Sequence, residues 1–267
     1  MKFLYETHLH TSQGSACSNT PGREYPKLYK DLGYDGIFVT DHFFQGNCAA
    51  PRTGEWVKRV DAYMAGYFDA KEAGEKIGFD VFFGIEQNYN GDEYLLYGIN
   101  REFLLQNPDI ESWPRLVLFD KVRAWGGCVV QAHPFRERDY IKKMHFQLDG
   151  IDGVEAVNMG NHPWEDASGL LYGRSLGLPL TCGSDMHRSE NVTRDRLGGV
   201  ALGERLTSSS DYADYVRARK PITLVFPPER LIGISPRMPY TPYETVRGDA
   251  PESDFSLGGA ISLNVGR

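Results

Sequence analysis

Short apolar runs alternate with longer segments of helical period along most of this chain. The runs cover residues 2–7, 36–40, 81–85, 94–99, 127–132, 153–158, 178–182 and 222–226. Short apolar runs separated by helical patterns are typical of repeated βα units. The pattern therefore predicts an α/β fold with a parallel sheet, such as a TIM-like barrel.

The segments between the runs supply the helices. Helical period predicts helices at 24–32, 53–77, 112–125, 163–176 and 211–219, with Thr53 as a candidate N-cap and Gly33 and Gly78 as stops. Residues 236–267 contain scattered proline and glycine without a clear period, so we expect irregular structure there. Nothing resembles a linker, so we expect one domain, with a barrel over residues 1–235 and a C-terminal extension over 236–267 that is packed on the barrel or irregular.

The composition narrows the range of partners. The formal net charge of −7 argues against a nucleic-acid polymer, which normally requires a basic face, and suits a protein that binds cations. No stretch approaches the roughly 20 apolar residues of a membrane span, and Glu6 and His8 interrupt the start of the chain before a signal peptide could form. The four cysteines form no C-x-x-C pair. We therefore expect a cytoplasmic protein without a membrane partner, of undetermined oligomeric state.

Most of the histidines stand at or just beyond the carboxyl ends of predicted strands. In a parallel α/β barrel this rim is where functional side chains converge, so residues remote in sequence can share one pocket. Five of the seven histidines lie in the segments HLH, DH, AHP and GSDMH: His8, His10, His42, His133 and His187.

Two of these segments repeat one geometry. His8 and His10 are two residues apart at the end of an extended run, where alternate side chains point to the same side, so both imidazoles can reach one ion. Asp185 and His187 have the same spacing. One such pair alone would more often be an accident, but several pairs at strand ends together indicate a metal site.

Carboxylates end two of the strands. Asp41 precedes His42 and could be a ligand or could orient a neighbouring imidazole, which is the commoner role beside a metal-bound histidine. Glu86 ends the run 81–85 and is placed to bridge two ions, although it could instead cap a turn or pair with an arginine. Pro134 excludes helix for His133, and such rigidity suits a ligand.

Two histidines remain outside these segments. His145 lies in a polar stretch that we expect to be helical and solvated. His162 lies near the end of the run 153–158 and is a candidate for the substrate side of the site.

With these residues assembled, the chain resembles the PHP family, named for its polymerase and histidinol phosphatase members. The resemblance covers most of the chain and rests on five motifs in order. They are His8-Leu9-His10-Thr11, Thr40-Asp41-His42, Glu86, His133-Pro134 and Gly183-Ser184-Asp185-Met186-His187. The resemblance implies a distorted seven-stranded (β/α)7 barrel with two or three divalent ions, usually zinc, manganese or iron, and places Asn158 on the pocket rim.

The chain departs from the family at two positions. Many trinuclear members have a further histidine shortly after H-x-H and another on the fourth strand, where this chain has none. Cys17 could substitute for the first and Glu93 or Asp92 for the second. The departures favour two well-held ions over three.

The ligand set predicts a hydrolase. More than four His and carboxylate ligands exceed what one tetrahedral zinc can use, so at least two ions are expected. We expect Glu86 and Asp185 to bridge them and a water held between them to attack the phosphorus of a phosphate ester. Arg188 and Arg136 are the candidates for binding the phosphate.

Three alternatives stay open. The chain could be an amidohydrolase-type barrel that cleaves C–N bonds, or a PHP module that keeps metal for structure without catalysis. Within phosphate esters, histidinol phosphate, other small phosphomonoesters, nucleotides and phosphodiesters are equally open.

Overall fold

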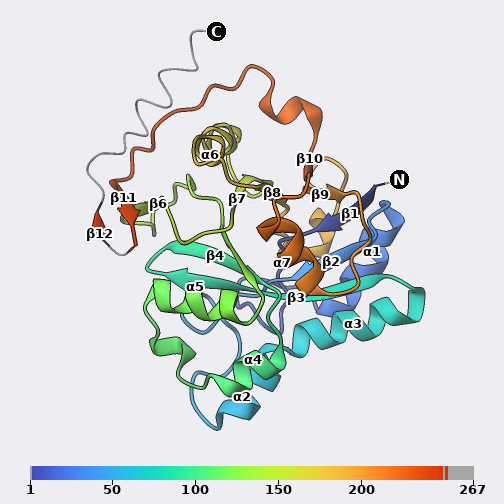
Figure 1. Cartoon of the computed structure of the whole chain (residues 1–267). Helices are drawn as coiled ribbons and strands as arrows, with labels where there is room; N and C mark the ends of the chain where they lie inside the picture. The colour runs from blue at the N-terminus through green and yellow to red at the C-terminus, as the bar shows by residue number, and fades with distance from the viewer. Residues whose placement is uncertain (1, 249, 252–267) are drawn as a thin grey trace.

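The computed structural model describes residues 2–248 and 250–251, and nine strands in this part form one sheet (Figure 1). They are β1 Phe3–Glu6, β2 Gly36–Val39, β3 Asp80–Tyr89, β4 Asp92–Tyr97, β5 Cys128–Gln131, β7 Gly153–Asn158, β8 Leu180–Gly183, β9 Gly199–Leu202 and β10 Thr223–Val225. Their order is β10-β9-β1-β2-β3-β4-β5-β7-β8.

The two ends of this sheet come close to closing it. The Cys182 thiol in β8 donates to the carbonyl of Val225 in β10 at 3.4 Å, and Gly198, just before β9, donates its N–H to Ser184 Oγ at 2.8 Å. The expected barrel-like α/β fold is therefore confirmed, with nine strands in the described sheet where seven were expected.

The sheet is mixed, so the prediction of a wholly parallel sheet was wrong. β1, β2 and β3 run parallel, as do β5, β7 and β8, but β4 is antiparallel to both of its neighbours and β9 is antiparallel to β1 and β10. The cause at β4 is a tight hairpin, because Asn90 and Gly91 both adopt positive φ, 56° and 106°. An Asn-Gly pair between two apolar runs is a strong hairpin signal.

Seven α-helices accompany the strands of the described chain. They are α1 Tyr25–Asp31, α2 Trp56–Tyr63, α3 Ala65–Ile77, α4 Arg101–Gln106, α5 Arg115–Ala124, α6 Pro163–Ser175 and α7 Ser209–Arg217. Four short 3-10 turns lie at Gly22–Glu24, Ile110–Ser112, Ser189–Asn191 and Pro228–Leu231. None of the described helices is long and apolar enough to cross a membrane.

The segment 53–77 is two helices, not the single helix that its period predicts. Met64, with φ −81° and ψ 0°, separates α2 from α3. The first helix follows Glu55, so Thr53 is not its N-cap. Gly78 does end α3, in the left-handed conformation at φ 64°. The unpredicted α4 begins after Asn100, whose side chain accepts a hydrogen bond from the N–H of Phe103 at 3.0 Å.

A second, smaller sheet joins the C-terminal extension to the body of the protein. Its strands are β6 Met144–Gln147, β11 Tyr243–Arg247 and β12 Ala250–Pro251, with β11 parallel to β6. The segment leading to β11 crosses α6, where Ser168 Oγ donates to the carbonyl of Arg237 at 2.8 Å (Figure 1). Residues 236–242 lie outside helices and strands, as expected, but the expectation of irregular structure was wrong for 243–247 and 250–251, which form strands. Residues 249 and 252–267 lie outside the described residues.

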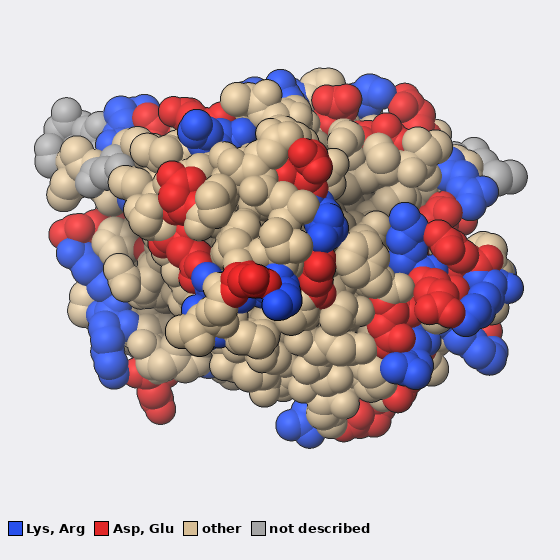
Figure 2. Space-filling view, turned by 90° about the horizontal axis from the view of Figure 1, so that it is seen from below, with Lys and Arg blue, Asp and Glu red and all other residues tan. Residues whose placement is uncertain are grey.

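His145 is also corrected by this sheet. It lies in β6 rather than in a helix, is half-buried, and places Nδ1 2.6 Å from Asp92 Oδ2. Elsewhere on the surface, the face shown in Figure 2 carries basic and acidic side chains interspersed among uncharged ones.

Candidate metal centre

Two isolated parallel bridges beyond the strand ends bring most of the predicted ligands together. The chain beyond β1 continues extended, and Leu9 forms a parallel bridge with Met186, which follows β8, so His8-Leu9-His10 lies beside Asp185-Met186-His187. A second parallel bridge joins His42, just past β2, to Glu86 in β3. The sequence thus delivers ligands at the carboxyl ends of β1, β2, β8 and β5, together with a carboxylate within β3.

The deepest set of ligands is His8, Glu86 and His133, which we call the inner group. All three are buried. Glu86 Oε1 lies 3.1 Å from His8 Nε2 and 3.0 Å from His133 Nε2. One carboxylate oxygen and two imidazole nitrogens thus converge in a site that excludes solvent.

Asp185 and His10 adjoin the inner group. His10 Nε2 lies 3.1 Å from both His8 Nε2 and Asp185 Oδ1. Asp185 has φ 54° and His133 has φ 28°, conformations that cost non-glycine residues about 1–3 kcal/mol and gather at functional sites. Both ligands are therefore held where the local backbone alone would not place them.

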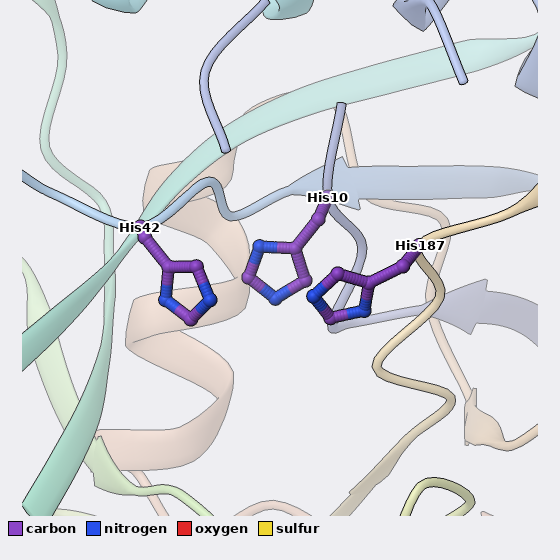
Figure 3. Close-up of side chains that lie close together, drawn as sticks. All are labelled: His10, His42 and His187. Carbon is purple, nitrogen blue, oxygen red and sulfur yellow. The ribbon is translucent and has the colours of Figure 1, made fainter. Parts of the chain in front are cut away.

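The second set is His10, His42 and His187, which we call the outer group. The three residues come from three separate segments, and their rings face one another (Figure 3). The His10 ring centroid lies 4.4 Å from that of His42 and 4.2 Å from that of His187. Unlike the inner group, His42 and His187 are partly exposed.

Glu86 connects the two groups. Its Oε2 atom lies 2.8 Å from His42 Nδ1 and 3.3 Å from His10 Nε2, while Oε1 faces the inner group. Glu86 Oε2 and His42 Nδ1 are both buried, and their approach at 2.8 Å does not have the geometry of a hydrogen bond. Buried polar atoms are rarely left unpaired. The donor set therefore fits a cation between them.

Glu93 in β4 adds a further oxygen to this set. Its Oε1 atom lies 3.6 Å from His42 Nδ1 and its Oε2 atom 3.5 Å from His133 Nε2. Of the two carboxylates suggested for the fourth strand, the structure thus brings Glu93 to the ligands. Asp92 points to the opposite side of the strand and accepts hydrogen bonds from His145.

Buried carboxylates orient two of the imidazoles from behind. Glu155 Oε1 lies 2.9 Å from His8 Nδ1, which turns His8 Nε2 toward Glu86. Asp41 accepts a hydrogen bond from Ser15 Oγ at 2.7 Å, and Ser15 Oγ lies 3.0 Å from His10 Nδ1. Asp41 therefore acts on a ligand through Ser15, in the orienting arrangement that was weighed for it.

Glu155 was missed at the sequence level. It lies in β7 between apolar residues, and a glutamate in the middle of a buried strand is itself a signal, because such residues are almost never placed there for packing.

The proposed substrate residues divide into two pairs. Arg136 lies at the site, with Nη1 2.7 Å from Asp185 Oδ2 and Nη2 donating to Asn158 Oδ1 at 2.8 Å. Asn158 in turn donates to Glu155 Oε2 at 2.9 Å. Arg188 is instead exposed, with its nearest carboxylate, that of Glu190, 3.8 Å away.

His162 also stays outside the cluster. It is exposed at the N-terminus of α6, where its backbone N–H donates to Glu165 Oε2 at 2.7 Å. Its position near the end of β7 therefore does not bring its side chain among the ligands.

The pKa values of the two central carboxylates are set by the basic groups packed against them. Burial alone would raise the pKa of Glu86, but the imidazoles of His8 and His42 outweigh it and hold the pKa well below its usual value. Burial would likewise raise the pKa of Asp185, but His8 and Arg136 outweigh it and hold the pKa well below its usual value. Both carboxylates are therefore ionised and available to a cation.

The imidazoles of His8 and His10 differ in pKa. Burial would lower the pKa of His8, but Glu155, Asp185 and Glu86 raise it well above its usual value. Burial, together with the neighbouring His187 and His42, holds the pKa of His10 well below its usual value. His10 is therefore neutral near pH 7, which is the form that binds metal.

A cavity of about 470 Å³ opens onto the outer group. Its walls combine ligands with amide side chains, one tyrosine and one thiol. The lining residues are Cys17, His42, Gln45, Gly46, Asn47, Asn88, Glu93, Arg136, Tyr140, Asp185 and His187. Burial alone would raise the pKa of the Cys17 thiol, but the nearby imidazoles of His187 and His42 outweigh it and lower the pKa to about 6.

Sequence comparison adds nothing to these observations, because no protein-family model and no curated protein matches the chain. Solved structures do match. A two-domain protein from Bacteroides vulgatus that contains a predicted PHP-like metal-dependent phosphoesterase aligns with 87% of this chain and 68% of its own, at 14% identity and a TM-score of 0.56.

Two further structures are more distant. One is a predicted metal-dependent phosphoesterase from Bifidobacterium adolescentis. Its alignment covers 79% of this chain and 96% of its own chain, at 17% identity and a TM-score of 0.48. An amidohydrolase from Chromobacterium violaceum with bound sulfate and no metal covers 82% and 97%, at 14% identity and a TM-score of 0.49. The likeness to the Bacteroides protein shows that this chain has the PHP-like fold that its sequence motifs predict.

Proposed function

We propose that this protein is a metal-dependent hydrolase of phosphate esters that works with at least two divalent ions. The observation that carries the proposal is the position of Glu86, whose two oxygens face different ligand groups. Oε1 is directed to His8 and His133, and Oε2 to His42 and His10. A carboxylate in this position is suited to bridge two cations.

Bound divalent ions would supply Lewis acidity and lower the pKa of a coordinated water toward neutrality. The chain contributes the arrangement around them. His8, Glu86 and His133 exclude solvent from the inner side, while His42 and His187 open to the cavity where a substrate can enter. A substrate phosphate would therefore approach from the side of the outer group.

Arg136 supports a phosphate ester as the substrate. Among the described residues that line the cavity, it is the only lysine or arginine. Asp185, Asn158 and Asn161 hold its guanidinium in place. A guanidinium fixed in this way is pre-organised to meet phosphate oxygens.

A substrate panel tests this proposal. The zinc- or manganese-loaded protein would be assayed against histidinol phosphate, other phosphomonoesters, nucleotides and phosphodiesters, and in parallel against amides and cyclic ureides. We expect metal-dependent turnover of phosphate esters only. Turnover of amides or ureides would instead favour an amidohydrolase, and loss of fold on chelation without any turnover would favour a structural metal module.

The matched variants are Glu86→Ala and, as a control, Glu190→Ala on the surface. We expect Glu86→Ala to abolish metal-dependent turnover and the control to retain it. Unchanged activity and metal content in Glu86→Ala would refute the bridging role.

A further inference from the structure

Arg136 uses only part of its hydrogen-bonding capacity on the protein. A guanidinium carries five N–H donors. The Nη1 atom of Arg136 lies 2.7 Å from Asp185 Oδ2. Its Nη2 atom donates to Asn158 Oδ1 at 2.8 Å, and its Nε atom donates to Asn161 Oδ1 at 2.9 Å. These contacts leave two N–H donors without a partner among the described residues, on a side chain that lines the cavity.

Two carboxylates determine which way the asparagine amides point. Asn158 Nδ2 donates to Glu155 Oε2 at 2.9 Å. Asn161 Nδ2 donates to Asp166 Oδ1 at 3.0 Å. Because each amide nitrogen faces a carboxylate, each amide oxygen is turned to the guanidinium of Arg136. Both asparagines are buried, so neighbouring protein groups rather than bulk water hold them in this orientation.

Arg230 holds the same two asparagines through their backbone. It lies in the 3-10 turn Pro228–Leu231, between β10 and β11 (Figure 1), and its side chain is only 11% exposed. Its Nη2 atom donates to the carbonyl oxygens of Asn158 at 2.9 Å and Asn161 at 2.7 Å. Its Nε atom pairs with Asp166 Oδ2 at 2.6 Å. One guanidinium therefore binds both asparagines and the carboxylate that orients one of them.

These contacts do more than attach the segment after β10 to α6. The ion pair between Arg230 and Asp166 alone would attach it. The two further hydrogen bonds go to the residues whose side chains hold Arg136. Arg230 itself is not among the described residues that line the cavity, so its effect on a substrate would pass through Arg136.

We propose that Arg230 is a positioning residue for the substrate phosphate. It keeps Asn158 and Asn161 in the arrangement that directs the two remaining N–H donors of Arg136 to phosphate oxygens. The inference rests on the proposed function and deepens it, because it makes a turn from the last part of the described chain necessary for phosphate recognition.

Binding of inorganic phosphate tests this inference without turnover. Calorimetry compares the zinc-loaded, full-length wild type with Arg230→Met, Arg136→Met and the variant that carries both substitutions. The matched control is Arg174→Met, which replaces an exposed arginine on α6. Arg230→Lys is added because it keeps the positive charge beside Asp166 and so protects the fold. Its single ammonium group cannot serve the carboxylate and both carbonyl oxygens together.

We expect Arg230→Met and Arg136→Met each to weaken phosphate binding about tenfold or more, and Arg230→Lys to weaken it less. Arg230→Met should cause no further loss once Arg136 has been replaced, because it acts through that side chain. The zinc content and the Arg174→Met control should match the wild type. Unchanged affinity in Arg230→Met, an equal loss with and without Arg136, or a parallel loss of zinc would overturn the inference.

A second measurement follows Arg136 without phosphate. Its Nε–H is bonded to Asn161, so it should exchange slowly with solvent in NMR spectra of the arginine side chains, where Arg136→Met identifies the signal. Arg230→Met should lose this protection and Arg174→Met should keep it. Unchanged protection in Arg230→Met would overturn the positioning role. A wild type that shows the expected signals but binds no phosphate would instead contradict the proposed function and leave the positioning of Arg136 intact.

Discussion

The inner group and the outer group share Glu86 but differ in burial and in charge. His8, Glu86 and His133 are all buried, and Glu155 supports His8 from behind. The outer group has two partly exposed imidazoles, and its orienting carboxylate, Asp41, acts only through Ser15.

Because of this difference, an ion bound at the inner group and one bound at the outer group would be held with different strength. A charge transferred into a buried position is costly unless it is compensated, and the inner group compensates it with the ionised carboxylate of Glu86 at hydrogen-bond distance. An inner ion would therefore be retained. An outer ion has less protein around it, faces the cavity, and is the one that would exchange and meet the substrate.

The largest effect is expected from Glu86→Gln, because this residue serves both groups. The substitution keeps the shape of the side chain but removes its charge, so both sites should lose metal together. We expect metal-dependent hydrolysis to fall by about 10²- to 10³-fold or more. Metal content measured by atomic emission would check this, and loss of metal from one site only would show that the groups do not depend on a shared bridge.

Glu155→Gln should act on the inner group alone. Glu155 is fully buried and directly contacts His8 Nδ1, so the neutral amide weakens the orientation and basicity of that ligand. Loss of such an orienting partner weakens metal binding about 10- to 100-fold, and direct contact favours the upper end of that range. Competition with a chelator would measure it. An equal loss at the outer site would break the distinction between the groups.

The sequence could predict the features of this comparison that depend on the local apolar pattern, but not those that depend on the direction of a side chain. A strand end is visible in the apolar pattern, which is why the sequence predicts as ligands His8, His10, His42, Glu86, His133, Asp185 and His187. Arg188 and His162 follow strand ends equally closely, yet both side chains are exposed. Proximity along the chain does not determine the direction in which a side chain points.

Long-range pairing accounts for the elements that were not predicted. β6 is a strand because β11, which lies near the C-terminal end of the described chain, pairs with it. The residues of β6 alone do not show a strand pattern. The hairpin of β3 and β4 could have been predicted, since Asn90-Gly91 was a visible turn signal. The choice of Glu93 over Asp92 depended on strand register, which the sequence does not specify.

Asp41→Asn should act on the outer group and more weakly than Glu155→Gln. Asp41 reaches His10 only through Ser15, so the substitution loosens the ligand without removing its nearest partner. We expect about tenfold weaker Co²⁺ binding at the outer group and little change at the inner group. Asp61→Asn, an exposed aspartate on α2, is the control. A larger loss at the inner group would reverse the comparison.

The smallest effect on metal binding is expected from Asp166, which we expect to act on stability beneath the inner side of the site. Asp166 is buried in α6, accepts a hydrogen bond from the N–H of Asn158 at 3.0 Å and pairs with Arg230 at 2.6 Å, yet burial raises its pKa to about 6. Because this pKa is higher than in the unfolded chain, the folded protein binds the proton more tightly. The resulting stability is present below about pH 4 and is lost as the pH rises through about 6.

The variant Asp166→Asn removes this titration. Asparagine does not titrate, so the difference in unfolding free energy between wild type and variant should shift in favour of the wild type, by about 1–3 kcal/mol, from pH 8 to pH 4, as Asp166 becomes protonated. Denaturant titrations at several pH values would measure the shift. A difference in unfolding free energy that does not change with pH would contradict the raised pKa of Asp166. A pH-dependent difference without any change in metal binding would show that this carboxylate supports the inner side structurally and takes no part in holding ions.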